Sequence, residues 1–130
     1  MGRPLAVYRL GQVGYGPTLA LQKRLQQARI AGEIDDTLLL LEHRRVITLG
    51  RGAKSQNILF SKAVLAARGF EVHEIGRGGD VTYHGPGQLV GYPIVDLKPD
   101  RKDVRRYVHM LEESMIRVCD DYGVSAGRIA

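Results

Sequence analysis

The side chains best suited to chemistry lie in one stretch, residues 77–93, which combines an arginine, a histidine and two tyrosines with repeated glycines. Its centre, 81–83, has the β-branched and aromatic residues typical of a strand. Glycines precede this centre at 78–79 and follow it within 85–87, and such glycines often mark a close approach of a ligand or another backbone. The pattern predicts a strand, a glycine bend, a short strand, a glycine turn and a third strand. It places the arginine and the histidine near the two ends of the short strand.

Residue types alone leave two interpretations of this stretch open. Either its polar groups, with Arg77 and His84 foremost, converge on a pocket, as ligand sites require, or it is a glycine-rich meander whose histidine has a partner within the fold. The other two histidines that adjoin predicted strands, His43 and His73, are assigned no chemical role. A lone histidine beside a buried strand is more often a core or turn residue than a catalyst.

The order of residue types in 77–93 resembles the signature of the octanoyltransferases of lipoate biosynthesis, the LipB family. The shared pattern is Arg-Gly-Gly-x-x-Thr-aromatic-His-x-x-Gly-Gln-x-Val-x-Tyr-Pro, and every position of it is met. The resemblance continues through 38–43, 46–51 and the long helix predicted near the C-terminus. It therefore covers nearly the whole chain, and its central motif is long enough to be specific.

The resemblance implies an acyltransferase that needs no ATP and no other cofactor. Family members take an octanoyl group from acyl carrier protein and pass it to a lysine of the lipoyl domains of 2-oxoacid dehydrogenases or of the glycine-cleavage H protein. The acyl group rests on a cysteine as a thioester, and a lysine lowers the pKa of that cysteine. Exchange of a thioester with a thiolate costs little free energy, and the acceptor amine then forms a stable amide.

The resemblance also implies which residues bind the acyl substrate. The glycines would let the backbone line a narrow acyl slot, and the histidine would lie beside the thioester, where it orients groups or relays protons. The expected substrate-binding residues are Arg77, Gly78, Gly79, Asp80, Val81, Thr82, Tyr83 and His84. A further pocket is expected at Arg51, Gly87 and Gln88, although spacing alone describes the arginine equally well as a solvated turn residue.

The chain departs from the family pattern at its C-terminal end. The family's catalytic lysine and cysteine follow the long helix, and we expect both beyond Ala130, because Lys98, Lys102 and Cys119 do not match their places. We therefore expect the chain to be an N-terminal portion of a transferase domain, whether a fragment, a truncated product or half of a split enzyme. No catalytic residue is predicted within it, and no turnover is expected of it alone.

Two rival functions remain open beside the transferase. An ATP-dependent lipoate or biotin protein ligase shares the expected fold, but the continuation of the motif at 82–88 fits the transferase better. A non-catalytic binding half of a split enzyme would keep a carrier-protein docking surface. A nucleic-acid-binding domain is disfavoured, because the chain has no recognisable nucleic-acid module and no aromatic residues interleaved with its basic ones.

Composition is that of one globular domain of 130 residues, with 44% hydrophobic and 25% charged residues. The net charge of +5 favours an acidic partner, although solubility explains it as well. No apolar run approaches the roughly 20 residues of a membrane span, and no secretory signal is recognisable, so a cytoplasmic location is expected. The single cysteine excludes an internal disulfide, and no cysteine and histidine spacing predicts a metal site.

Periodicity and turn residues predict an α+β fold in which helices pack on a mixed, largely antiparallel sheet. This agrees with the fold that the resemblance implies, the catalytic domain of biotin and lipoate protein ligases, here incomplete at the C-terminus. The predicted strands are 4–10, 38–41, 46–49, 70–75, 81–83 and 89–97, and the predicted helices are 17–31, 61–68 and 102–122. The run 38–41 is expected to be buried on both faces, and 89–97 to lie at a sheet edge because it contains glycine and proline.

The last helix has an apolar stripe with residues recurring at i, i+3, i+4 and i+7. Cys119 lies inside this stripe and is expected to be a buried, chemically inert thiol. Basic residues gather at the N-terminal end of the helix, where the helix dipole makes them unfavourable. This local cost suggests docking of an acidic partner on Arg101, Lys102, Arg105 and Arg106.

Overall fold

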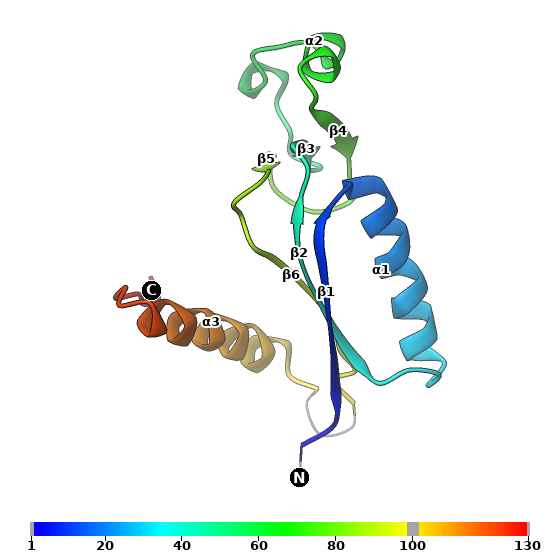
Figure 1. The fold of residues 1–130 in the computed structure, drawn as a ribbon, viewed down its shortest axis with the longest axis vertical. Helices are drawn as coiled ribbons and strands as arrows, with labels where there is room; N and C mark the ends of the chain where they lie inside the picture. The colour runs from blue at the N-terminus through cyan, green and yellow to red at the C-terminus, as the bar shows by residue number, and fades with distance from the viewer. Residues whose placement is uncertain (1, 99–101, 130) are drawn as a thin grey trace. The chain divides into compact units, whose positions relative to one another are not determined.

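A computed structural model describes residues 2–98 and 102–129, which fall into two compact units divided after Val95. The first unit contains all the strands and the first two α-helices, and the second contains the last helix (Figure 1). The mixed α+β fold class is confirmed, whereas a single continuous sheet is not, because the strands form two sheets of three. Two of the four strand pairings are parallel and two are antiparallel.

The first sheet has the strand order β1-β2-β6, with β1 at Leu5–Val13, β2 at Asp36–His43 and β6 at Val90–Ile94. Strands β1 and β2 are parallel, and helix α1, Tyr15–Ile30, forms the crossover between them. Strand β6 pairs antiparallel with β2 and is an edge strand, as its glycine and proline predicted.

Strand β1 is longer than its sequence pattern predicted. It continues to Val13 because the register shifts between Arg9 and Gly11, where Gly11 adopts a φ of 68° that favours glycine. The central strand β2 alternates, with Leu39 and Leu41 buried and their neighbours half-buried. The prediction that 38–41 is buried on both faces is therefore wrong, because only one face of β2 turns into the core.

The second sheet has the order β4-β3-β5, with β3 at Val46–Leu49, β4 at Glu71–Glu74 and β5 at Val81–His84. A 3₁₀ turn, η1 at Ser55–Asn57, and helix α2 at Lys62–Ala67 connect β3 to its parallel neighbour β4. The Ser61 hydroxyl accepts from the backbone N–H of Val64, so the predicted N-cap is confirmed.

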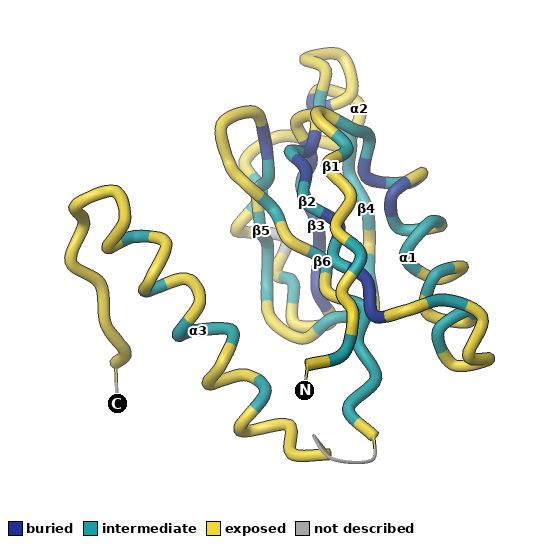
Figure 2. The backbone as a smooth tube through the Cα atoms, turned by 60° about the horizontal axis from the view of Figure 1, so that its bottom comes forward, coloured by how far each residue is buried: buried dark blue, intermediate teal, exposed yellow. Residues whose placement is uncertain are grey.

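The core of the first unit gathers at the end of β2 and the start of β3. Val46 and His43 have no exposed surface, and Leu39, Leu41 and Leu49 are nearly as deeply buried (Figure 2). Both sheets therefore contribute to the core at the place where the chain passes from one to the other.

The second unit is built on helix α3, Val104–Asp121, and the segment that follows it. Asp103 caps the helix, since its carboxylate accepts from the backbone N–H of Arg106 at 3.0 Å. This acidic cap, which the sequence analysis missed, offsets the unfavourable charge of the neighbouring basic residues. Lys102, Arg105 and Arg106 are exposed, while Arg101 lies outside the described residues.

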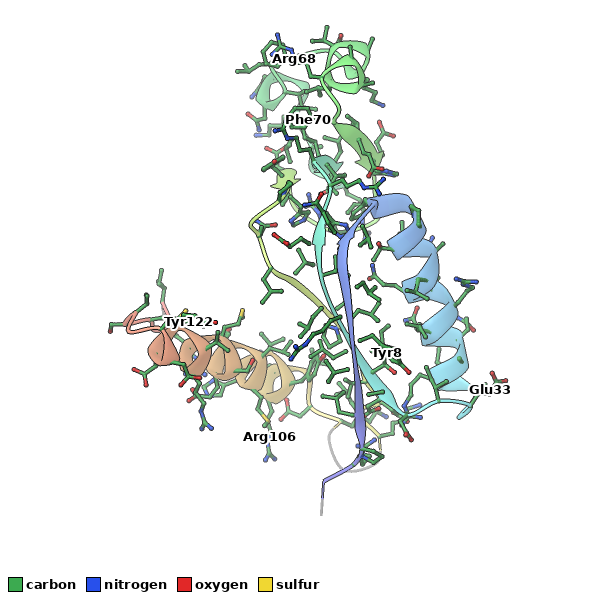
Figure 3. All side chains as sticks on the ribbon, in the orientation of Figure 1. Tyr8, Glu33, Arg68, Phe70, Arg106 and Tyr122 are labelled. Carbon is green, nitrogen blue, oxygen red and sulfur yellow. The ribbon has the colours of Figure 1, made fainter. Side chains whose placement is uncertain are left out.

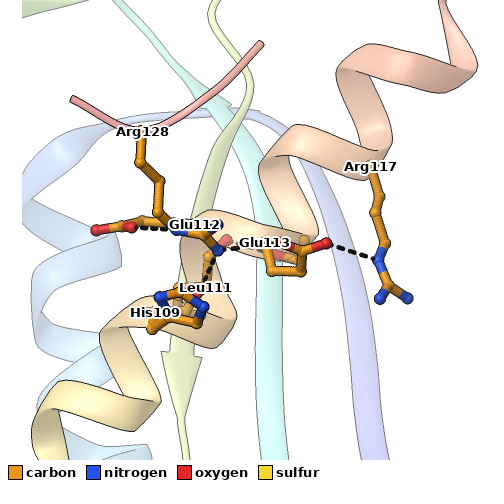
Figure 4. Close-up of polar contacts among 7 residues, drawn as sticks. His109, Leu111, Glu112, Glu113, Arg117 and Arg128 are labelled. Atoms are coloured by element: carbon orange, nitrogen blue, oxygen red, sulfur yellow. Dashed lines mark hydrogen bonds and ion pairs between the residues drawn. The ribbon is translucent and has the colours of Figure 1, made fainter. Parts of the chain in front are cut away.

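The segment after α3 returns along the helix and is held by Arg128 (Figure 4). Its guanidinium contacts the carboxylates of Glu112 and Glu113 at 2.8 and 3.0 Å and donates to the His109 carbonyl at 2.9 Å. None of the α3 side chains is buried, and Cys119 is half-exposed. The prediction that the Cys119 thiol is buried is therefore wrong, because one helix and a short returning segment offer too little surface to cover it.

No helix within the described ranges has both the length and the apolar character needed to cross a bilayer.

Candidate functional site

The residues of the predicted substrate segment form a bend and a strand that rest on the turn after β3. The bend at 77–80 is joined to this turn by three backbone hydrogen bonds, in which Gly50, Arg51 and Gly52 donate to Asp80, Arg77 and Gly79 at 2.8–3.0 Å. Strand β5 then pairs with β3, with Val46 opposite His84. Residues 77–84 thus form one continuous stretch of backbone, the ledge, along β3 and the turn after it.

Glycine is required where the two turns meet. A Cβ atom on Gly50 would lie 2.4 Å from the Gly79 carbonyl oxygen and 2.9 Å from that of Gly78. Gly79 itself has a φ of 89°, a conformation that side chains other than glycine rarely adopt. The close backbone approach that the glycine pattern predicted is therefore present, but the partner is the protein's own chain.

The guanidinium of Arg77 is bound within the fold. Its Nη2 atom donates to the carbonyl and hydroxyl of Thr48, both at 3.0 Å, to the Thr82 hydroxyl at 2.9 Å and to the Asp80 carbonyl at 3.1 Å. Nη1 donates to the Gly78 carbonyl at 2.8 Å. Arg77 thus fixes the shape of the bend by cross-linking it to β3 and β5.

Asp80 supports the same bend from its other side. One carboxylate oxygen accepts from the backbone N–H of Lys54 at 2.8 Å, and the other accepts from the side-chain amide of Asn57. The acidic residue in the middle of the substrate segment therefore anchors the connection that leads to α2. The side chains of Arg77 and Asp80 therefore hold the bend in shape, and both are bonded to partners within the fold.

His84 is the titratable side chain of the segment that remains half-exposed next to the glycine turn. Its Nδ1 atom lies 2.5 Å from Oε1 of Gln88, so two predicted site residues are in direct contact. The backbone N–H of Gly87 donates to Glu42 at 2.5 Å, which ties the turn to the end of β2. His84 and Gln88 thus form a polar pair at the accessible rim of the segment.

Other predicted site residues point elsewhere. Arg51 is exposed and donates from Nε to the Gly76 carbonyl at 2.8 Å, so it has a partner in the turn, and the pocket expected around it stays a prediction. Tyr83 packs against Phe70, with ring centroids 6.0 Å apart, and remains 49% exposed. Val81 and Thr82 are half-buried, and the threonine hydroxyl is held by Arg77.

His43, for which a core or turn position was expected, lies directly behind His84. It is fully buried, its Nε2 atom is 2.7 Å from the Tyr92 hydroxyl, and its ring centroid is 6.0 Å from that of His84. Burial lowers the pKa of His43 from its usual value of 6.5, and the nearby imidazole of His84 acts in the same direction. The core assignment is confirmed, but the contact with the candidate site was not anticipated.

The aromatic array behind the site extends to α1 and β4. The Tyr15 ring lies between His43 and His73, at 5.1 and 5.0 Å. Glu71 accepts the backbone N–H of Tyr15 at 3.0 Å, so a carboxylate caps the helix N-terminus. Sequence reasoning missed Tyr15 and Glu71, since nothing in local spacing links residues so far apart; Tyr92, inside the motif, was within its reach.

A separate hollow of about 460 Å³ lies between α1 and the first sheet. Tyr8 and Glu33, labelled in Figure 3, both line it, together with Leu21, Leu25 and Leu39. None of the predicted substrate residues lines this hollow. In the described part of the chain, no cluster of three or more His, Cys, Asp or Glu side chains is arranged to hold a metal ion.

The chain resembles known proteins in both sequence and fold. Residues 15–130 match the family model of the lipoyl protein ligase A/B catalytic domain. The chain is 51% identical to an octanoyltransferase of Acidobacterium capsulatum, over 97% of this chain and 54% of that protein. It is 55% identical to an octanoyltransferase of Myxococcus xanthus, over 96% of this chain and 35% of that protein. The chain thus spans about half or less of the length of these relatives.

Among solved structures, the fold is similar to that of a putative lipoate protein ligase from T. acidophilum. The TM-score is 0.65 over 99% of this chain and 52% of that one, and the sequences are 16% identical. This similarity supports the fold that the sequence predicted, the catalytic domain of the lipoate ligases.

Proposed function

The chain belongs to the lipoyl protein ligase A/B catalytic domain family, and on that premise we propose that it serves octanoyl transfer in protein lipoylation. The octanoyl group comes from acyl carrier protein as a thioester. It is passed to a lysine of a lipoyl domain of a 2-oxoacid dehydrogenase or of the glycine-cleavage H protein. The reaction takes place in the cytoplasm and requires no ATP, because the acyl group arrives activated.

The observation that carries the proposal is the fixed shape of residues 77–84. The bend is cross-linked by the Arg77 guanidinium and seated on Gly50, so the segment needs no ordering when substrate arrives. Binding sites that are already ordered bind more tightly for the same contacts, because no conformational entropy is lost on binding. Residues 77–84 are accordingly the substrate-binding segment of the domain.

Within this segment, some residues hold the bend in shape and others are available to contact the substrate. Arg77 and Asp80 use their side chains to hold the bend, so they act on substrate through its shape. His84, half-exposed and paired with Gln88, is placed to meet the polar thioester group. Nothing lies within 4 Å of where a Cβ on Gly87 would be, which leaves room there for the acyl chain beside the backbone.

The test is binding of octanoyl-acyl carrier protein, compared with the same carrier protein lacking the acyl group. We expect saturable binding that prefers the acylated form and weakens several-fold in His84→Gln. The matched control is His73→Gln, an imidazole of β4 that contacts Tyr15 and not the substrate segment. Equal binding of the two carrier proteins, or equal loss in both variants, would refute the assignment of 77–84.

Intact-mass measurement after the same incubation separates the functional alternatives. We expect no octanoyl adduct on Cys119, which lies on α3 and outside the substrate segment. An octanoyl thioester mapped to Cys119 would make it the nucleophile. Saturable binding of ATP would instead favour an ATP-dependent ligase, the rival with the same fold.

A further inference from the structure

A buried imidazole with two polar partners lies behind the half-exposed His84. His43 has no exposed surface, and both of its ring nitrogens are engaged: Nδ1 is 3.3 Å from the Val13 carbonyl oxygen and Nε2 is 2.7 Å from the Tyr92 hydroxyl. The rings of His43 and His84 are 6.0 Å apart with an angle of 50° between their planes. The two imidazoles therefore form a close pair, one inside the core and one at its surface.

The two partners determine which nitrogen of His43 carries hydrogen. A carbonyl oxygen can only accept, so Nδ1 must be the protonated nitrogen, and in a neutral ring Nε2 is then an acceptor. The Tyr92 hydroxyl supplies the matching donor. Burial raises the pKa of Tyr92 to about 12, so the hydroxyl keeps its proton. The neutral Nδ1–H tautomer satisfies every polar atom of this contact.

The titratable groups around His43 come from four elements. His84 on β5 disfavours a positive charge on His43, and Glu71 on β4 favours one, but burial has the largest effect and keeps the ring neutral. Tyr92 on β6 and Tyr15 on α1 are themselves uncharged, since burial raises the pKa of both phenols. If His43 and His84 were both protonated, their two positive charges would repel each other.

We propose that His43 is a positioning residue for His84: held as the neutral Nδ1–H tautomer by Val13 and Tyr92, it places an uncharged ring behind His84. The hydrogens on His43 and Tyr92 stay in place. The inference rests on the proposed function in one respect, because that function sets His84 beside the thioester. There an uncharged ring lies on the core side of His84, so no like charge opposes a positive charge at the thioester.

The first test measures charge and tautomer directly, by ¹⁵N NMR of histidine-labelled protein between pH 5 and pH 8. We expect His43 to keep one protonated nitrogen, Nδ1, throughout this range. An Nε2–H tautomer of His43, or an imidazolium signal from His43 over the same range as His84, would overturn the proposal. This measurement needs no folded variant.

The second test changes Tyr92, which donates to His43 but whose hydroxyl is not bonded to His84. Tyr92→Phe removes the donor that favours the neutral ring, so His43 should take up a proton at a higher pH than in the parent chain. Repulsion should then lower the titration midpoint of His84. Coulomb's law bounds the shift between about 0.5 and about 2 pH units for full charges at this separation.

The double variant His43→Phe/Tyr92→Phe should return the His84 midpoint to its parent value, because the competing imidazole is gone. Tyr15→Phe is the matched control, since Tyr15 contacts the His43 ring without donating to it, and it should leave the midpoint unchanged. Unchanged titration of both histidines in folded Tyr92→Phe would contradict the proposal. Because these readouts do not involve octanoyl substrate, they can fail while the proposed function holds, or hold while it fails.

Discussion

Gly50 and Gly79 are in such close backbone contact that a methyl group on Gly50 would overlap the carbonyl oxygen of Gly79, at 2.4 Å. Gly52 strengthens the same contact by donating its N–H to Gly79 at 2.9 Å. The turn after β3 is therefore a seat for the bend that leads into β5. The conformation of the proposed substrate segment depends on a turn that lies well before it in the sequence.

Replacing Gly50 should disturb this seat. We expect Gly50→Ala to lower the free energy of unfolding by about 1–3 kcal/mol, as overpacking at a rigid backbone contact does. Urea unfolding measures the change. Gly76→Ala is the control, because a Cβ at Gly76 meets nothing within 4 Å, and it should be neutral or slightly stabilising. Equal effects of the two substitutions would show that the contact between the turns is loose.

Exchanging Arg77 for lysine should be costly although the charge is kept. A lysine ammonium cannot reproduce the forked set of bonds to Thr48, Thr82 and the bend carbonyls. We expect Arg77→Lys to cost about 1–3 kcal/mol of unfolding free energy, because the buried Thr48 and the half-buried Thr82 lose a donor.

The matched control for this exchange is Arg51→Lys, in the turn that follows β3. Arg51 is exposed and makes one side-chain bond, to the Gly76 carbonyl, so its replacement should change the unfolding free energy by less than about 1 kcal/mol. If the two exchanges cost the same, Arg77 does not organise the bend.

The buried His43 should make the fold less stable in mild acid. Its pKa is lowered in the folded state, so the unfolded chain takes up a proton first as the pH falls below about 6.5. The difference in unfolding free energy between the parent chain and His43→Gln should therefore shrink from pH 7.5 to pH 5.5. Urea unfolding at the two pH values measures both differences, and a constant difference would mean that folding does not lower the pKa of His43.

Arg128 should hold the segment that follows α3. We expect Arg128→Gln to release residues 124–129, seen as faster amide exchange, because the contacts to Glu112 and Glu113 are lost. Arg117→Gln, which removes only the contact to Glu113 within the helix, should leave that segment protected.

The same contact predicts an acid dependence. The guanidinium of Arg128, and then that of Arg117, lowers the pKa of Glu113. A carboxylate with a lowered pKa stabilises the fold above its ordinary range and loses that effect as the pH falls through the lowered value. Protection of 124–129 should therefore decrease in acid, and protection that is independent of pH would contradict this account.

Sequence patterns predicted the elements well where local chemistry determines them. The cap at Ser61, the strand 46–49 and the edge position of β6 all follow from residues within one element. The failures have long-range causes. The exposure of Cys119 depends on how much surface covers α3, and burial on one face of β2 depends on which neighbours pack there.

The candidate site shows the same division. The motif singled out residues 77–84 and contains both His84 and Gln88, although their direct contact was not predicted. It did not identify His43 behind the ledge, since its contact to Tyr92 spans 49 positions. Nor did it show that Arg77 serves the fold, because a guanidinium in a glycine-rich stretch gives no sign of where its acceptors lie.

The capping of α1 by Glu71 has a consequence for the order in which the chain acquires structure. The backbone N–H of Tyr15 finds its acceptor 56 residues later, in β4. During synthesis, the first turn of α1 therefore leaves the ribosome well before its cap exists. Helix ends without a cap fray, so the start of α1 should become stable only after β4 has joined β3. The first turn of α1 should thus be among the last parts of the first unit to become stable.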